Sequence, residues 1–222
     1  MKTNLGLVEY CKAQLGKPYW YGTFGQIATE NLLRQKSAQY PTQYKWTDFV
    51  EQYGQKVHDC VGLIKGYLWS ENLNSTPIYN SKQDKDVNGM KANCTETGNI
   101  KSIPELPGVL VFMNGHVGIY VGNGYVIEAR GHLYGVVKTK LKDRPWTEWG
   151  KLRWLEYKKA LVLFEAGQGH EALNYLVEQG RVTDREQALH KIEVVKNEDW
   201  NYIKWANDVI KLRELERGGK NE

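Results

Sequence analysis

The stretch His58-Asp59-Cys60-Val61-Gly62-Leu63 decides how this sequence is interpreted, because a polar, turn-prone run meets an apolar, helix-like stretch there. The apolar stretch continues to Trp69 and predicts a helix that begins at Cys60. A helix N-terminus carries unsatisfied N–H groups and partial positive charge, which favour an anion. Since only the thiolate form of a cysteine attacks, Cys60 is a candidate nucleophile.

A histidine follows in a predicted β-meander. Residues 109–121 hold two β-like runs separated by Asn114-Gly115, and this dipeptide is the strongest short signal for a hairpin. Gly122-Asn123-Gly124 links the second run to a third at residues 125–129. The sequence therefore predicts three consecutive antiparallel strands, with His116 at the start of the middle strand.

Glu128 lies on the third predicted strand, across one tight turn from the strand of His116. The two side chains can face the same side of the sheet, although a bulge would change that parity. A thiol and a nearby imidazole are the two parts that a cysteine nucleophile needs, and a carboxylate can orient the imidazole. These residues alone leave two alternatives open: a buried structural Cys60 beside an ordinary strand histidine, and an exposed strand residue at Glu128.

Four pieces of the chain, taken in order, resemble the NlpC family of cell-wall cysteine peptidases, which have a papain-like fold. They are Leu15-Gly16-Lys17-Pro18-Tyr19-Trp20-Tyr21-Gly22, Asp59-Cys60-Val61-Gly62-Leu63, residues 107–120 and Val126-Ile127-Glu128-Ala129. Residues 146–150, near the end of the predicted sheet, also fit. The resemblance implies an α+β catalytic domain over residues 1–157, with N-terminal helices and a central antiparallel sheet.

The resemblance also implies catalytic roles for three residues. Cys60 would be the nucleophile, His116 the general base and then the general acid, and Glu128 the residue that orients the imidazole. The family usually has a histidine where this chain has Glu128. A glutamate at this position is similar to the related CHAP group of amidases and peptidases, so the choice of amide bond stays open.

Substrate contacts follow from the same resemblance. Tyr19 or Tyr21 would donate to the oxyanion or line the pocket, and Asp59 resembles the family residue that meets a free amine of the stem peptide. Val61 replaces the usual serine, which removes a hydroxyl beside the nucleophile. The stretch at residues 26–57 is longer than the common spacing, and we call it the insert.

The insert is predicted to be helical, with one helix at residues 28–39 and a short second helix that Thr47 opens as a cap. Both ends of the insert lie next to proposed site residues, so one hypothesis is that it walls one side of the substrate groove. A packing elaboration without a role at the site is the alternative. Residues 72–104, which include Cys94, are polar and turn-rich and predict a surface loop with one helical turn.

Composition limits the remaining function classes. The 222 residues allow one sizeable domain and a small one, and the net charge of +4 suits an anionic cell-wall surface. No basic stripe interleaved with aromatic residues indicates nucleic-acid binding, and no apolar run is long enough to predict a membrane span. The three cysteines, Cys11, Cys60 and Cys94, have no spacing that predicts a disulfide framework or a metal site. No cofactor is expected.

Residues 158–222 differ from the rest of the chain because they show almost no strand pattern. Thr183-Asp184-Arg185-Glu186 is a capping box, and apolar residues at helical intervals follow it. The sequence predicts a small α-helical C-terminal module, whose role is left open among wall binding, self-association and packing on the catalytic domain.

The expected function is hydrolysis of an amide bond in bacterial peptidoglycan by a Cys-His-Glu thiol mechanism, with stem-peptide endopeptidase as the first choice. An N-acetylmuramoyl-L-alanine amidase and a non-catalytic wall-binding or structural relative are the alternatives. The first residues contain no signal-peptide pattern. Together with the resemblance, this pattern suggests a phage endolysin that is made in the host cytoplasm and then acts on the cell wall.

Overall fold

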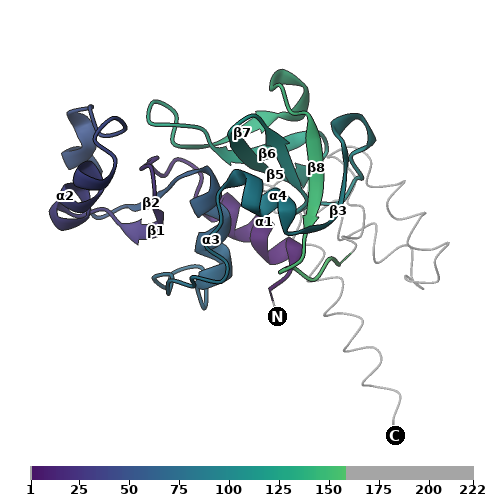
Figure 1. The fold of residues 1–222 in the computed structure, drawn as a ribbon, viewed down its shortest axis with the longest axis horizontal. Helices are drawn as coiled ribbons and strands as arrows, with labels where there is room; N and C mark the ends of the chain where they lie inside the picture. Colours follow the sequence, from purple (N-terminus) through teal and green to yellow (C-terminus); the bar gives the residue numbers. More distant parts are fainter. Residues whose placement is uncertain (1, 159–222) are drawn as a thin grey trace, which may run out of the picture. The chain divides into compact units, whose positions relative to one another are not determined.

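The computed structural model describes residues 2–158, which fall within one compact unit (Figure 1). The α-helical module predicted for residues 158–222 lies outside the described residues beyond Lys158. No helix among residues 2–158 is long and apolar enough to cross a membrane.

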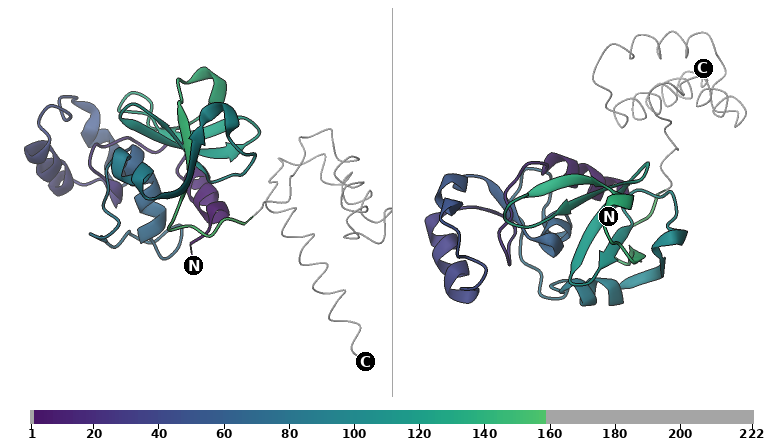
Figure 2. Two further views of the ribbon diagram at one scale, coloured as in Figure 1. Left: turned by 45° about the vertical axis from the view of Figure 1, so that its right-hand side comes forward. Right: turned by 90° about the horizontal axis from the view of Figure 1, so that it is seen from above.

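A six-stranded antiparallel sheet forms the centre of this unit, with strands in the order β3-β8-β4-β5-β6-β7 (Figures 1 and 2). The strands are β3 (Cys94–Asn99), β4 (Leu110–Met113), β5 (His116–Gly122), β6 (Tyr125–Ala129), β7 (Val136–Lys140) and β8 (Glu148–Leu152). The predicted meander is therefore confirmed as β4, β5 and β6. The mixture of helices with an antiparallel sheet is the α+β class that the sequence predicts.

Within residues 2–158, four α-helices and three short 3-10 helices accompany the strands. They are α1 (Asn4–Ala13), α2 (Glu30–Gln39), α3 (Cys60–Trp69), α4 (Val87–Ala92), η1 (Asp48–Gln52), η2 (Ile100–Ser102) and η3 (Leu141–Asp143). Oxygen-bearing side chains cap the N-termini of the α-helices: Thr3 accepts from the Gly6 amide, and Asp59 accepts from the Gly62 amide. These caps satisfy amide groups that the helix itself leaves unpaired.

Two clusters of buried side chains, one on each face of the sheet, stabilise the unit. Alternate residues of β4 face opposite ways, because side chains alternate along a strand. Leu110 and Phe112 join the core formed with α1 and α3, whereas Val111 packs with Trp146 and Trp149 on the other face. Each fully buried apolar side chain contributes about 1.5–3 kcal/mol, so the packing of α3 on the sheet is what fixes the position of Cys60.

The turns of the meander have the backbone geometry that their residues favour. Met113 pairs with His116, so Asn114 and Gly115 make a two-residue connection, and Gly115 has a φ of 68°. Asn123 and Gly124 connect β5 to β6 with φ values of 52° and 72°. Positive φ at both Asn123 and Gly124 suits a tight two-residue hairpin, whereas the first turn has positive φ only at Gly115. Both predicted connections are confirmed by the strand pairing.

The insert is helical as predicted, and it also contains two short strands that the sequence did not indicate. Strands β1 (Phe24–Ile27) and β2 (Lys56–His58) pair in antiparallel fashion and hold its two ends together. Between them lie α2 and η1, which Figure 1 shows at the end of the unit away from β3 and β8. Thr47 makes no side-chain cap to η1, so that part of the prediction is wrong. Thr29 instead caps α2 through the Leu32 amide.

The segment at residues 72–104 is only partly a loop. The one predicted helical turn is confirmed as α4, but Cys94 begins strand β3 and pairs with Leu152 of β8. The loop prediction for Cys94 is therefore wrong. Strand β3 lies at the edge of the sheet and is largely polar, so its sequence lacks the alternation of apolar residues that indicates a strand.

Candidate active site

Cys60 is the first residue of α3, as the sequence predicts. Its side chain is buried, and its sulfur accepts from the backbone amides of Val61 and of Val117. Val117 follows His116 on β5, so this contact brings the thiol against the start of the strand that carries the histidine. The helix that positions the sulfur and the strand that positions the imidazole are thus packed against one another at the site.

The Cys60 thiol is protonated in this arrangement. Burial, followed by the charge of Asp59, raises its pKa to about 12, and the amide contacts only partly offset this rise. A buried environment disfavours the thiolate because the anion loses its hydration. The helix N-terminus therefore does not by itself generate the nucleophile, and a base must remove the proton.

His116 and Glu128 form a direct hydrogen bond across neighbouring strands. The distance between His116 Nε2 and Glu128 Oε2 is 2.7 Å. A bulge does interrupt β5 and β6, but it lies between Tyr120 and Gly122, toward the turn and away from His116. With Nε2 held by the carboxylate, Nδ1 is the ring nitrogen that remains for the thiol.

Glu128 is completely buried, and four hydrogen bonds satisfy its carboxylate. Besides His116, Arg144 donates from Nε and from Nη2, each at 3.0 Å, and Thr139 donates from Oγ1 at 2.8 Å. Burial alone would raise the pKa of Glu128, but the hydrogen bonds from His116, Arg144 and Thr139 outweigh it and hold the pKa below its ordinary value. The residue is therefore a buried anion, and not the exposed strand residue that was its alternative.

Trp146 fixes the plane of the His116 ring. The two rings are stacked at a centroid distance of 5.6 Å and an interplanar angle of 18°. Gly118 makes room for the indole, because a Cβ on this glycine would lie 3.0 Å from Trp146 and 2.6 Å from Val126. The imidazole is thus held at its edge by Glu128 and on its face by Trp146.

Asp59 shapes the entry to the site through its backbone contacts. Its Oδ1 accepts from the Gly62 amide at 2.5 Å and its Oδ2 accepts from the Gly22 amide at 2.8 Å. Burial raises the pKa of Asp59 above its usual value, although these two amides act in the opposite direction. The residue as a whole is half-buried, and a carboxylate has lone pairs left after two hydrogen bonds.

The two candidate tyrosines differ in position. Tyr19 is largely buried, and burial together with the nearby charges of Asp59 and Cys60 raises its pKa well above the usual value. Tyr21 is more exposed and packs edge-to-face on Tyr40 of the insert, at 4.9 Å between ring centroids. Tyr19 therefore lies near the thiol, whereas Tyr21 faces the insert.

His58 and Val61, which flank the nucleophile, are structural residues. His58 is fully buried, and its Nε2 lies 3.0 Å from the Tyr10 hydroxyl oxygen. Burial, with the charges of Lys56 and Lys17, lowers the pKa of His58 to about 3, so the ring is neutral. Val61 is buried in the core between α3 and the sheet, where a serine hydroxyl would need a partner.

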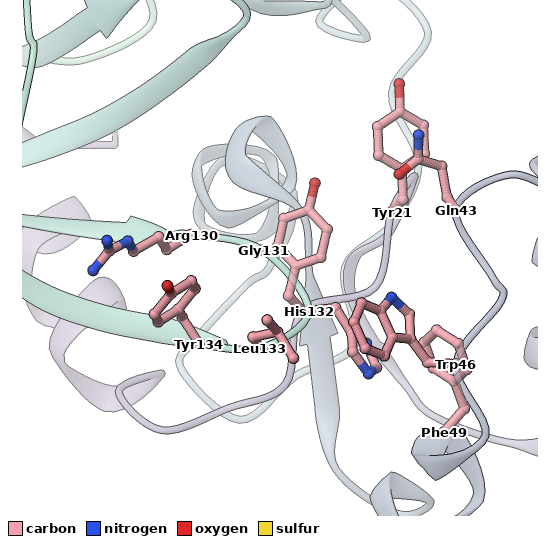
Figure 3. Close-up of a pocket in the computed structure, with 10 residues that line it drawn as sticks. Tyr21, Gln43, Trp46, Phe49, Arg130, Gly131, His132, Leu133 and Tyr134 are labelled. Carbon is pink, nitrogen blue, oxygen red and sulfur yellow. The ribbon is translucent and has the colours of Figure 1, made fainter.

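A pocket of about 310 Å³ lies between the insert and the loop after β6 (Figure 3). Its lining is Tyr19, Tyr21, Gln43, Trp46, Phe49, Arg130, Gly131, His132, Leu133 and Tyr134. His132 Nε2 is 2.7 Å from Asp48 Oδ1, and this hydrogen bond joins the two walls. Gln43, Trp46 and Phe49 belong to the insert and line the pocket together with Tyr19 and Tyr21, so the insert forms one wall of this cavity. That the cavity is part of the substrate groove stays a prediction.

Sequence reasoning missed Arg144 and Thr139, which donate to Glu128, and Trp146, which stacks on His116. One signal was present: Glu128 lies in an apolar run, and a buried carboxylate needs a cation or several donors. That signal predicts that a partner exists, but not which of the chain's many arginines and lysines supplies it. The pairing of His132 with Asp48 had no comparable signal in the sequence.

Comparisons with known proteins place these features in a family. The model of the "NlpC/P60 family" matches residues 41–153, which is half of the chain and includes Cys60, His116 and Glu128. The match does not include the Gly-x-Pro-Tyr-like segment at residues 15–22. No curated protein matches the chain.

Several solved structures are similar to the described unit. NlpC2 from Trichomonas vaginalis is 18% identical with a TM-score of 0.42, and the match covers 71% of this chain and 48% of that one. The P60 domain of an antigen from M. avium subspecies paratuberculosis is 19% identical with a TM-score of 0.41, covering 69% and 96%. The peptidoglycan hydrolase RipB from Mycobacterium tuberculosis is 17% identical with a TM-score of 0.39, covering 69% and 67%.

The match to NlpC2 thus spans about half the length of that protein. The residues that the family model matches include α3, β5 and β6, the elements that carry Cys60, His116 and Glu128. The chain therefore belongs to the NlpC/P60 family, whose members are in general cysteine peptidases of peptidoglycan.

Proposed function

We propose that this protein hydrolyses an amide bond of bacterial peptidoglycan, with the Cys60 thiol as nucleophile. The observation that carries the proposal is the hydrogen bond of 2.7 Å between His116 and the buried Glu128, on a strand whose next amide donates to the Cys60 sulfur. A nucleophile, a base and an oriented carboxylate in that order are the parts of a catalytic triad.

The first half of the reaction forms an acyl-enzyme. His116 Nδ1 takes the thiol proton as the sulfur attacks the carbonyl carbon, because the raised pKa of Cys60 opposes a preformed thiolate. The carbonyl π electrons move to oxygen, and backbone amides at the start of α3 together with the Tyr19 hydroxyl are the donors available to that oxyanion. The imidazolium then gives its proton to the leaving amine as the C–N bond breaks, which leaves a thioester on Cys60.

The second half returns the enzyme to its starting state. His116 takes a proton from water, the resulting hydroxide adds to the thioester carbon, and the C–S bond breaks as the sulfur regains the proton from the imidazolium. Glu128 stabilises the imidazolium in both halves, and Arg144 keeps Glu128 ionised, so the carboxylate orients the ring without taking its proton.

Within this reaction class, we propose a stem-peptide endopeptidase first. Asp59 supports this choice, because it directly precedes Cys60 and its carboxylate retains lone pairs for a free amine of a peptide. Cleavage between sugar and peptide, as by an N-acetylmuramoyl-L-alanine amidase, is the second candidate, and Glu128 favours it because the CHAP group shares this residue type. A phage endolysin released from the host cytoplasm to the cell wall is our proposal for the biological setting.

The test is digestion of purified cell walls by the wild type and by Cys60→Ala, with mass spectrometry of the released fragments. We expect Cys60→Ala to lose on the order of 10³-fold or more of the activity, as removal of a triad member does. Cys94→Ala is the matched control, because Cys94 is also a free cysteine but lies on edge strand β3. A folded Cys60→Ala protein that digests walls like the wild type would exclude the thiol mechanism. A wild-type protein that releases no fragments would instead support the alternative of a non-catalytic wall-binding relative.

A further inference from the structure

We propose that the pocket between the insert and the loop after β6 binds one N-acetylhexosamine ring of the glycan strand, while the attached peptide extends to Cys60. This inference rests on the proposed function, since it names the part of the same substrate that the pocket would hold. It also gives the insert a role in substrate recognition.

Trp46 provides the flat surface that a sugar ring needs. One face of its indole is stacked on His132, at a centroid distance of 4.8 Å and an interplanar angle of 16°, yet half of the residue is exposed. Pyranose rings carry a face of C–H groups, and such a face packs on an aromatic ring while the hydroxyl groups at the rim remain free for hydrogen bonds. In Figure 3 the Trp46 indole lies over His132 on the pocket wall.

His132 supports the Trp46 indole and is itself fixed by neighbouring side chains. The His132 side chain is 9% exposed, its Nε2 lies 2.7 Å from the acceptor Asp48 Oδ1, and its ring packs on Phe49 at 4.7 Å between ring centroids. These contacts fix the support of the indole before any ligand arrives. A preformed surface costs less conformational entropy on binding than one that must be ordered by the ligand.

The rim of the pocket carries polar groups suited to hydroxyl and acetamido groups. Gln43, Tyr21 and Tyr134 each provide both a donor and an acceptor, and Arg130, whose guanidinium lies 4.1 Å from the Tyr134 ring centroid, provides donors only. Arg130 is the only lining residue with a permanent charge, so a cationic amine is disfavoured there. A neutral, hydroxyl-rich ring matches this lining better than a charged peptide side chain.

The size and place of the pocket agree with one sugar joined to a peptide. A volume of about 310 Å³ lies at the lower end of the range for small-molecule sites, roughly 300–1,000 Å³. Tyr19 lines the pocket and also packs against the buried core that includes Cys60. Tyr19 therefore joins the pocket to the part of the core that holds the reacting sulfur.

The decisive experiment is titration of the full chain with the trisaccharide of N-acetylglucosamine, followed by NMR. We expect saturable shifts of the Trp46 indole N–H, and at least a tenfold higher Kd in Trp46→Ala. Tyr79→Ala is the matched control, because Tyr79 is an aromatic residue about as exposed as Trp46 but lies outside the pocket, and it should leave Kd unchanged. Trp46→Phe should retain part of the affinity, which separates loss of the aromatic face from loss of the fold.

The titration does not depend on catalysis, so its failure is distinguishable from failure of the proposed function. Absence of saturable binding, or equal affinity of wild type and Trp46→Ala, would overturn the sugar proposal even if walls are digested. With hydrolysis confirmed, Trp46→Ala should lower kcat/KM at least tenfold for disaccharide-peptides and leave it within about twofold for sugar-free stem peptides. An equal loss on both substrates would show a peptide subsite and would also overturn the proposal.

Discussion

The candidate active site and the insert pocket contain the same local interaction in different surroundings. In each, a histidine Nε2 lies 2.7 Å from a carboxylate oxygen: His116 pairs with Glu128, and His132 pairs with Asp48. The Glu128 side chain is 0% exposed and the Asp48 side chain is 48% exposed. Equal distances therefore accompany a fully buried carboxylate in one region and a half-exposed carboxylate in the other.

This difference in burial shows why hydrogen-bond length alone does not tell which of the two pairs contributes more to the stability of the protein. Water stabilises the half-exposed Asp48 directly and screens its attraction to His132, so removing His132 would leave a solvated carboxylate. Glu128 has no water to replace a lost partner, and the protein compensates with Arg144 and Thr139. The buried pair requires its whole network, whereas the exposed pair acts as a local link between two walls.

Replacing the cation of the buried network should give the largest effect. We expect Arg144→Met to lower the free energy of unfolding by about 3–5 kcal/mol, because it leaves Glu128 as an uncompensated buried charge. Urea denaturation at pH 7 measures this loss. The double variant Arg144→Met/Glu128→Gln should recover a substantial part of it, since the charge that needs compensation is gone. A single variant within about 1 kcal/mol of the wild type would contradict the view that Arg144 balances Glu128.

Acid should weaken the same network in a defined pH window. The pKa of Glu128 is lower in the folded protein than its ordinary value of 4.5, so folding favours the ionised form. The stability that this gives is fully present above about pH 4.5 and is lost as the pH falls through the folded-state pKa.

Comparison of the wild type with Glu128→Gln isolates this contribution from other titrating groups such as His58. The difference in unfolding free energy should be constant from pH 7 to about pH 5 and should shrink below that. One linked proton limits the slope to about 1.4 kcal/mol per pH unit. Urea denaturation at several pH values provides the measurement. A difference that grows on acidification would mean that the folded-state pKa is raised, contrary to the hydrogen bonds observed.

The sequence predicted the candidate site because its main parts follow from local patterns. The polar-to-apolar change at Cys60 indicates a helix start, and the Asn-Gly turns fix three consecutive strands, which brings Glu128 beside His116. Arg144 and Thr139 could not be assigned in this way, because their contact with Glu128 depends on how the chain returns after β7. Short-range patterns constrain neighbours along the chain, while a choice among many cations is made by tertiary packing.

The secondary structure shows the same contrast between elements that local sequence patterns predict and elements that depend on tertiary packing. The helix at residues 28–39 and the helix that begins at Cys60 were predicted and correspond to α2 and α3, but strands β1 and β3 were not predicted. Strand β1 has four residues, and β3 is a polar edge strand, so neither carries enough alternating apolar residues to signal a strand. Their pairing partners, β2 and β8, supply the hydrogen bonds that define them.

The smallest effect is expected at the exposed pair. Asp48→Asn removes the negative charge and keeps a side chain that can accept a hydrogen bond from His132, so the free energy of unfolding should fall by at most about 1 kcal/mol. Raising the salt concentration should reduce the difference from the wild type further, because solvent ions screen an exposed pair. The same salt titration should leave the Arg144→Met deficit nearly unchanged, since Glu128 is out of reach of solvent ions. A loss at Asp48→Asn as large as that at Arg144→Met would mean that joining the two pocket walls, and not burial of the carboxylate, determines what a histidine–carboxylate pair contributes here.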